Sequence, residues 1–203
     1  MNKIKYISVI IILSILGCGH VDSYLDMAKE KGISKTYINA LNSWTRKASL
    51  YSQFETKLQI TATFKSEDFN RAYREEYARI YYLTAEETKR REEMAAGLSR
   101  DYREFFVYAA MPQKEANDFD RPNSSWSIFL IDEKGNNIKP LEVRRIDRIA
   151  PIMEGFYPYI NKYYGTCYSV KFLPVVAEKK TGASEPMKLV FTSVLGRVEV
   201  LWP

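Results

Sequence analysis

The clearest periodic signal in the chain is an alternation of apolar and polar residues between positions 54 and 65. The even positions from Phe54 to Phe64 carry apolar side chains or threonine, and the odd positions carry Glu, Lys, Gln or Thr. Side chains that alternate in this way lie on opposite faces of a strand, so the pattern predicts a strand that is buried on one face. A weaker alternation begins at Trp44 and predicts a shorter strand that ends near Leu50.

The period then changes to that of a helix. Ser66 precedes two acidic residues, which favours a capped helix start with negative charge at the positive end of the helix dipole. Aromatic and aliphatic residues from Phe69 to Ile80 follow at helical spacing and predict an apolar stripe. The sequence Thr-Ala-Glu-Glu at 84–87 is typical of a capping box and begins a second, highly charged helix. We therefore expect a helical hairpin at about 66–98, inserted between strands.

Several later segments each predict a strand, and the first of them is almost continuously apolar. They span 104–111, 126–132, 138–146, 167–176, 187–192 and 197–202. Turn residues near Gly135 predict that 126–146 is one hairpin, while Pro140 and Pro174 indicate sheet edges or bulges. About eight strands with frequent turn signals indicate a mainly β protein (α+β) and favour a two-sheet sandwich over a barrel. We expect a two-sheet antiparallel sandwich, immunoglobulin-like in architecture although the Cys…Trp…Cys signature is absent, with the helical hairpin inserted.

The first eighteen residues carry a different signal. Lys3 and Lys5 give a positively charged start, and residues 7–16 are apolar apart from two serines. This stretch is too short for a permanent transmembrane helix, which needs about 20 apolar residues, and it is typical of a secretory signal. It closes with Ile15-Leu16-Gly17-Cys18, which resembles the lipobox of bacterial lipoprotein precursors.

The resemblance implies that residues 1–17 are a cleaved signal peptide and that Cys18 carries a diacylglycerol. Each buried methylene contributes about 0.8 kcal/mol, so two or three acyl chains hold a protein firmly at a membrane. Residues 18–42 would form the anchor and a helical lead, which either packs on the domain or acts as a spacer, and 43–203 the sandwich domain. Gly19 implies the periplasmic face of the outer membrane if the source has two membranes. Beyond the lipobox, the chain resembles other envelope lipoproteins only loosely, and no named family or activity follows.

Composition limits the number of domains, the kinds of partner and the disulfides that the chain can have. The chain has 203 residues and a formal charge of +5, and removal of Lys3 and Lys5 with the signal leaves +3. This length suits one domain, and so small a charge argues against a nucleic-acid partner. Only two cysteines are present. Lipidation of Cys18 leaves Cys167 without a partner, so no disulfide framework is expected.

Few residues suit nucleophilic or metal chemistry. The only histidine, His20, lies two residues after the anchor. Cys167 therefore lacks the usual general base and is expected to be a small buried side chain. No zinc-ligand spacing or nucleotide-binding loop occurs, so we expect no cofactor and no metal centre. Oxygens of Asp118, Asp120 and Asn123 could together bind Ca²⁺, but turns made by their side chains explain such a loop more simply.

Paired carboxylates are the other chemical possibility. Glycoside hydrolysis needs two carboxyl groups that flank the scissile bond, and it needs no histidine. The candidates lie on the predicted helical hairpin beside arginines, where ion pairing also explains them. They are Glu75, Glu76, Glu86, Glu87, Glu92 and Glu93.

The aromatic segment at 156–164 is the candidate binding surface. Rigid aromatic faces on a loop suit stacking on sugars or capture of a peptide, and the arginines just upstream could add hydrogen-bond donors. The alternative is a loop that folds over an open end of the sandwich and buries its rings. The candidate residues are Phe156, Tyr157, Tyr159, Tyr163, Tyr164 and Arg145.

Together these patterns predict a lipid-anchored cell-envelope protein that is not an enzyme. We expect it to contact the membrane through lipid on Cys18 and to bind an envelope protein or a glycan. A carboxylate-dependent hydrolase of cell-wall or surface glycan is the alternative from another class. A structural subunit of a lipoprotein assembly is the third possibility.

Overall fold

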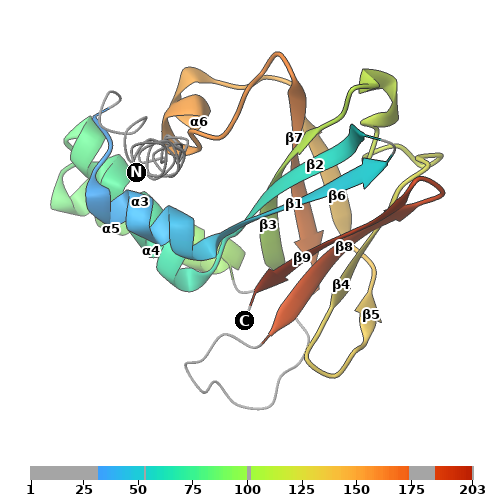
Figure 1. Ribbon diagram of the computed structural model, residues 1–203. Helices are drawn as coiled ribbons and strands as arrows, with labels where there is room; N and C mark the ends of the chain where they lie inside the picture. The colour runs from blue at the N-terminus through green and yellow to red at the C-terminus, as the bar shows by residue number, and fades with distance from the viewer. Residues whose placement is uncertain (1–31, 53, 100–101, 174–185, 203) are drawn as a thin grey trace, which may run out of the picture.

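The computed structural model describes residues 32–52, 54–99, 102–173 and 186–202. Two antiparallel sheets, of five and four strands, face each other, and helices gather at one side of this sandwich (Figure 1). This arrangement confirms the predicted mainly β sandwich with a helical insertion. The lipobox, His20 and Pro174 lie outside the described residues. Within them, no helix has the length and apolar character that crossing a bilayer requires.

The larger sheet has the strand order β1-β2-β3-β7-β6. Its strands are β1 (Thr45–Ser52), β2 (Glu55–Phe64), β3 (Arg103–Ala110), β7 (Gly165–Phe172) and β6 (Glu142–Ile146). The smaller sheet has the order β5-β4-β8-β9. Its strands are β5 (Asn137–Ile138), β4 (Ser127–Ile131), β8 (Met187–Ser193) and β9 (Gly196–Trp202). Because the first three strands lie side by side in one sheet, the likeness to immunoglobulin domains extends to the sandwich architecture and not to the strand order.

The single hairpin predicted for 126–146 is wrong. After β4, the Asp132 carboxylate accepts hydrogen bonds from the backbone of Lys134 and Asn136, at 3.0 and 2.8 Å, and shapes the turn into β5. The chain then leaves this sheet, passes Pro140 and joins the other sheet as β6, which pairs with β7. Proline has no backbone N–H to donate to a neighbouring strand. Pro140 therefore lies where β5 has ended and β6 has not yet begun.

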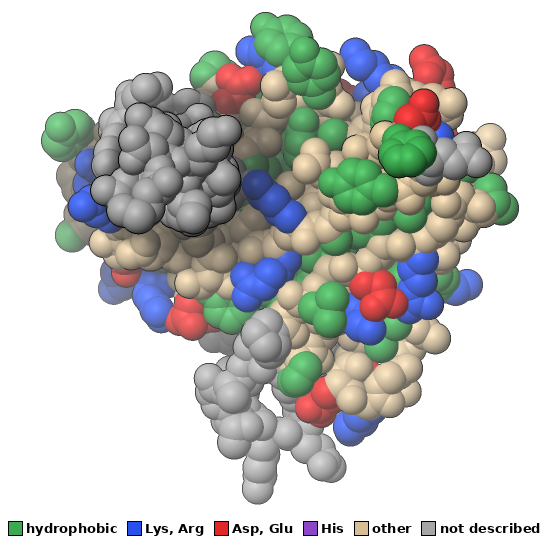
Figure 2. All heavy atoms as spheres, in the orientation of Figure 1, with side chains coloured by type: hydrophobic (Ala, Val, Ile, Leu, Met, Phe, Trp, Pro, Cys, Tyr) green, Lys and Arg blue, Asp and Glu red, His purple; other side chains and the backbone are tan. Residues whose placement is uncertain are grey.

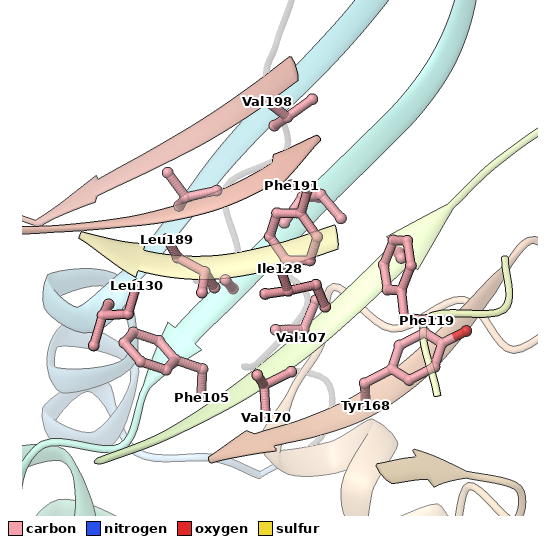
Figure 3. Close-up of a cluster of buried hydrophobic side chains, with 14 of the residues drawn as sticks. Phe105, Val107, Phe119, Ile128, Leu130, Tyr168, Val170, Leu189, Phe191 and Val198 are labelled. Carbon is pink, nitrogen blue, oxygen red and sulfur yellow. The ribbon is translucent and has the colours of Figure 1, made fainter. Parts of the chain in front are cut away.

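The inner core fills the space between the two sheets. Side chains of β3 and β7, such as Phe105 and Val170, face side chains of β4 and β8, such as Leu130 and Leu189 (Figure 3). On β2, Leu58, Ile60 and Ala62 of the predicted apolar set lie in this core, whereas Phe54 precedes the strand and is exposed, so that end of the prediction is wrong. At the end of β9 the Trp202 indole donates a hydrogen bond of 2.9 Å to the Trp44 carbonyl, which ties the last strand to the start of the first.

A second core lies on the outer face of the five-stranded sheet. The helices that contribute to it or border it are α3 (Lys35–Trp44), α4 (Glu67–Tyr81), α5 (Ala85–Ser99) and α6 (Pro151–Phe156). Phe106 and Cys167 point outward from the sheet and pack with Tyr37, Phe69 and Phe156 of the helices. Both faces of β3 and β7 are therefore covered, which explains why residues 105–111 are continuously apolar.

The two predicted helices at 66–98 are confirmed as α4 and α5. Ser66 caps α4, because its hydroxyl accepts a hydrogen bond from the Phe69 backbone at 3.1 Å. Thr84 and Glu87 form the expected capping box, with the Thr84 backbone N–H donating to the Glu87 carboxylate at 2.9 Å. Between the helices, Tyr82 adopts a left-handed backbone conformation with φ 50°. Sequence reasoning placed Trp44 in a strand, whereas it ends α3.

The described part of the N-terminal lead packs on the domain through a buried carboxylate. Glu76 of α4 is 3% exposed. It accepts hydrogen bonds from the backbone and hydroxyl of Ser34, at 2.8 and 2.6 Å, and pairs with Arg79 at 2.7 Å. The Arg79 guanidinium also donates to the Gly32 carbonyl at 2.6 Å. From residue 32 onward the chain thus packs on the domain, and the earlier part of the predicted lead lies outside the described residues.

We expect Glu76→Gln to lower the free energy of unfolding at pH 7 by about 2 kcal/mol, because hydrogen bonds to a charged group are lost. Burial alone raises the pKa of Glu76, but hydrogen bonds from Arg79 and Ser34 outweigh it, so the pKa is lowered. This stability is fully present above the unfolded pKa, about 4.3, and is lost as pH falls through the folded pKa. Urea unfolding between pH 7 and pH 3 should show the difference from wild type shrinking. Glu75→Gln, on the exposed side of α4, is the control; equal effects of both changes would contradict the assignment.

Candidate functional site

A cleft of about 760 Å³ opens between the outer face of the five-stranded sheet and the α4–α5 hairpin. Its floor comes from β3, β6 and β7, and its walls come from α4, α5 and the α6 segment. The second core covers the rest of this sheet face with helices α3, α4 and α6. Small-molecule sites in proteins occupy roughly 300–1,000 Å³, so the cleft has the size of a ligand site.

The floor of the cleft follows from the register of three strands. Phe106 on β3 lies opposite Ser169 on β7, which lies opposite Arg144 on β6, so all three side chains share the outer face. Two residues before Phe106, Glu104 lies on the same face. Its carboxylate accepts hydrogen bonds from the Ser169 hydroxyl and the Lys65 ammonium, both at 2.8 Å. The acidic group in the floor is therefore held by two donors.

The helical wall follows from spacing along α4. Arg74 and Ala78, one turn apart, face the cleft, and Tyr73 and Tyr77 flank them. The Arg91 guanidinium carbon of α5 lies 4.9 Å from the centre of the Tyr77 ring, as in a cation–π contact. Aliphatic side chains from α5, the α6 segment and β6 complete the lining. They include Met94, Met153 and Ile146.

Positive charge predominates in the cleft. The described lining carries four cations, Lys65, Arg74, Arg91 and Arg144, against one carboxylate, Glu104. Lys65 is already paired with that carboxylate. The Nε atom of Arg144 lies 3.7 Å from a carboxylate oxygen of Glu142, which does not line the cleft, so this ion pair is long.

Arg74 is the one of these cations with a buried donor that the described residues leave unpaired. Its terminal nitrogen lies 3.6 Å from the Glu67 carboxylate, whose side chain is 74% exposed. Its Nε–H is buried and has no hydrogen-bond partner among the described residues. Buried polar groups normally have partners, so the Arg74 guanidinium in the cleft wall is incompletely satisfied by the described residues.

Two phenols of the cleft, Tyr73 and Tyr157, stay protonated at neutral pH. Burial raises the pKa of Tyr73 to about 12. Burial also raises the pKa of Tyr157 well above its ordinary value, with smaller contributions from Tyr73 and Glu104. Neutral phenols donate hydrogen bonds and offer aromatic faces, but they do not act as bases. The described lining supplies one carboxylate, Glu104, whereas glycoside hydrolysis uses two.

Part of the predicted aromatic binding surface is wrong, because its rings are covered. Phe156 and Tyr157 are 2% and 6% exposed, and the Tyr157 ring stacks on Phe106 with 4.2 Å between ring centres. The Tyr159 hydroxyl makes a 2.7 Å hydrogen bond with the Thr63 hydroxyl. The segment thus packs against the outer face of the larger sheet. The alternative interpretation was right that the rings are buried, but it placed them over an open end of the sandwich. Only Tyr157 contributes to the lining of the cleft.

The remaining predicted surface residues lie apart from the cleft. Tyr163 and Tyr164 are 70% and 69% exposed, and hydrophobic side chains are visible over the loop between α6 and β7 (Figure 2). The Lys162 ammonium lies 5.6 Å from the centre of the Tyr163 ring. Arg145 pairs with Asp147 at 3.3 Å, and it lies on the opposite face of β6 from Arg144 because successive residues alternate. A binding role for these exposed residues stays a prediction.

The other candidate residues are buried or make hydrogen bonds that shape the fold. Cys167 is fully buried, as expected, and burial raises the pKa of its thiol to about 12, so it stays protonated. In the loop proposed for Ca²⁺, Asp118 accepts a hydrogen bond of 2.8 Å from Ser124. Among the described residues, no group of three or more His, Cys, Asp or Glu side chains is placed to hold a metal ion. Of the suggested carboxylates, Glu76 docks the lead and Glu87 caps α5.

Sequence reasoning missed Arg74 as a cleft residue. The stripe that includes Tyr73 and Tyr77 indicated which side of α4 is apolar, and Arg74 borders that stripe. Several arginines lie along this helix, however, and only its docking on the sheet decides which of them faces the cleft.

Comparison of the chain with protein-family models, curated proteins and solved structures found no match.

Proposed function

We propose that this chain is a lipid-anchored cell-envelope protein that binds a small, largely apolar molecule in the cleft and is not an enzyme. The observation that carries the proposal is the cleft itself, because it leaves aromatic and aliphatic side chains around an open space of ligand size. The lipobox that ends at Cys18 supports the envelope address. The exposed Tyr163 and Tyr164 are a second candidate contact, for an envelope protein or a glycan.

Methionine methyl groups offer a direct test of binding. Met94 and Met153 line the cleft, whereas Met111 and Met187 lie in the core between the sheets. The full chain, methyl-labelled at methionine and held in nanodiscs of neutral lipid, can be titrated with two probes while its NMR signals are followed. The probes are 4-phenylbutanol and 4-phenylbutyrate, which present one apolar body with a neutral or an anionic end. We expect saturable shifts at Met94 and Met153 and none at Met111 or Met187.

Ala78→Trp should abolish these shifts, because a large ring would then occupy the cleft from the wall of α4. Asn39→Trp is the matched control, since it adds the same ring on the exposed side of α3. The signals of Met111 and Met187 report whether each variant keeps its fold. Absence of saturable shifts with either probe, or unchanged shifts in Ala78→Trp, would contradict the proposed function.

A further inference from the structure

We propose that the ligand of the cleft is an organic anion, in which a carboxylate or phosphate binds Arg74 and an apolar body lies along the aromatic wall. This inference rests on the proposed function, namely that the cleft binds a small molecule at all. It goes further by assigning the charge of the ligand and the residue that recognises it.

The first support is the balance of charge. Glu104 is occupied by Lys65 and Ser169, and these two contacts leave three guanidinium groups in the cleft without a close carboxylate. Their closest carboxylate contacts within the described residues are 3.6 Å for Arg74 and 3.7 Å for Arg144. Arg91 lies over an aromatic ring and has a carboxylate one helical turn before it, at Glu87, which caps the helix. An incoming anion would offset this excess of positive charge.

The second support is the unpaired donor of Arg74. A guanidinium presents its N–H groups in a planar fork that matches the two oxygens of a carboxylate or two oxygens of a phosphate. The Nε–H of Arg74 is buried without a partner among the described residues, although Arg74 lines an open cleft. Among the described residues, the guanidinium as a whole has only one carboxylate near it, the exposed Glu67 at 3.6 Å, and a ligand anion bound to it would supply the missing acceptor. A neutral apolar ligand would supply none.

The third support is the apolar wall, which argues for an organic ion in preference to a bare inorganic one. Tyr73, Tyr77 and Phe106 line the same cleft as Arg74, and Tyr73 and Tyr77 belong to the same helix. Inorganic phosphate would leave the half-buried rings of Tyr73 and Tyr77 in contact with water, whereas an apolar body attached to the anionic group would cover them. Aromatic rings also give a flat contact area at a low cost in side-chain entropy.

Comparison of matched probes tests the charge of the ligand. Dissociation constants follow from the shifts of the Met94 and Met153 methyl groups in neutral-lipid nanodiscs. We expect 4-phenylbutyrate or 4-phenylbutyl phosphate to bind about 10- to 100-fold more tightly than 4-phenylbutanol, since hydrogen bonds to charged groups are strong. The two anions distinguish a carboxylate site from a phosphate site. Equal affinities for the alcohol and both anions would overturn the inference and leave the proposed function standing, whereas binding of none of them would overturn both.

Arg74→Met tests the assigned residue, because methionine keeps an apolar stem and removes the charge and the donors. We expect it to weaken binding of the preferred anion about 10-fold or more and to leave the alcohol within about twofold of wild type. Arg71→Met is the matched control: it lies on the same helix, pairs with Asp68 at 2.6 Å and does not line this cleft. An unchanged preference for the anion in Arg74→Met would overturn the role of Arg74.

A membrane lipid is the competing occupant with the same chemistry, because its headgroup is anionic and its chains are apolar. Nanodiscs that contain an anionic phospholipid, without added probe, separate the two sources. We expect Met94 and Met153 to keep the shifts that they have in neutral nanodiscs. A change at these two methyl groups alone would assign the cleft to the bilayer lipid and overturn the proposal of a free ligand.

Discussion

Replacing Cys18 by alanine is expected to abolish incorporation of labelled palmitate in bacteria that carry the lipoprotein pathway. Attachment of diacylglycerol needs the thiol of the lipobox cysteine, so the variant has no atom to which the lipid can be joined. Cleavage before this cysteine also depends on the lipid in proteins with this motif. We therefore expect the variant to stay at its precursor length, longer than the mature protein by residues 1–17.

The matched control is Cys167→Ala, which removes the other cysteine of the chain. Cys167 is fully buried and its thiol stays protonated, since burial raises its pKa to about 12. We expect this variant to incorporate palmitate and to be processed like the wild type. Label that survives in Cys18→Ala would contradict the lipoprotein assignment and, with it, the envelope address of the cleft. Fluorography and the mobility of the protein on denaturing gels measure both outcomes.

Local signals in the sequence predicted the elements whose environment is simple. The alternation up to Phe64 corresponds to β2, because one face of that strand meets the core between the sheets from Leu58 onward; Phe54 lies before the strand and is exposed. Ser66 and Thr84 marked the starts of α4 and α5, because each cap is made by residues within one turn. Such signals need no knowledge of which segments later come together.

The errors arose where distant segments decide the structure. Residues 138–146 were predicted as one strand that follows the turn near Gly135, but β5 pairs with β4 and β6 pairs with β7, and the sequence does not show the change of sheet. The aromatic segment at 156–164 had the composition of a binding loop. It packs inward because Phe106 and Phe69 leave an apolar surface that it can cover. Aromatic residues suit both uses, and only the neighbouring surface separates them.

The cleft could not be predicted from the sequence for the same reason, because distant segments form it. It exists because the helices cover most of the outer sheet face but leave the area between α4–α5 and β6 open. Arg144 and Arg145 are adjacent in sequence, yet one faces the cleft and the other pairs with Asp147 on the opposite face. Strand alternation predicts that two such neighbours differ, but it does not say which one faces the helices. The order of strands in the sheet settles that choice.

Tyr157→Ala is expected to lower the free energy of unfolding by about 3–5 kcal/mol, as is usual when a large buried aromatic side chain is truncated. The Tyr157 ring is 6% exposed, stacks on Phe106 at 4.2 Å and lies 6.2 Å from Phe69, measured between ring centres. It thus joins the sheet to α4 within the second core. Its loss would leave a cavity under the helices that wall the cleft, and rigid neighbours refill such space only in part. Urea unfolding at pH 7 measures the change.

Tyr164→Ala is the matched control, because the same side chain is removed from the same segment at a position that is 69% exposed. Exposed substitutions of this kind usually change stability by less than about 0.5 kcal/mol. A large difference between the two variants follows if the segment is held by burial of its first rings and presents only its last ones to solvent. Similar small effects of both changes would mean that Tyr157 is not packed as described. The wall of the cleft, which depends on that packing, would then be in question as well.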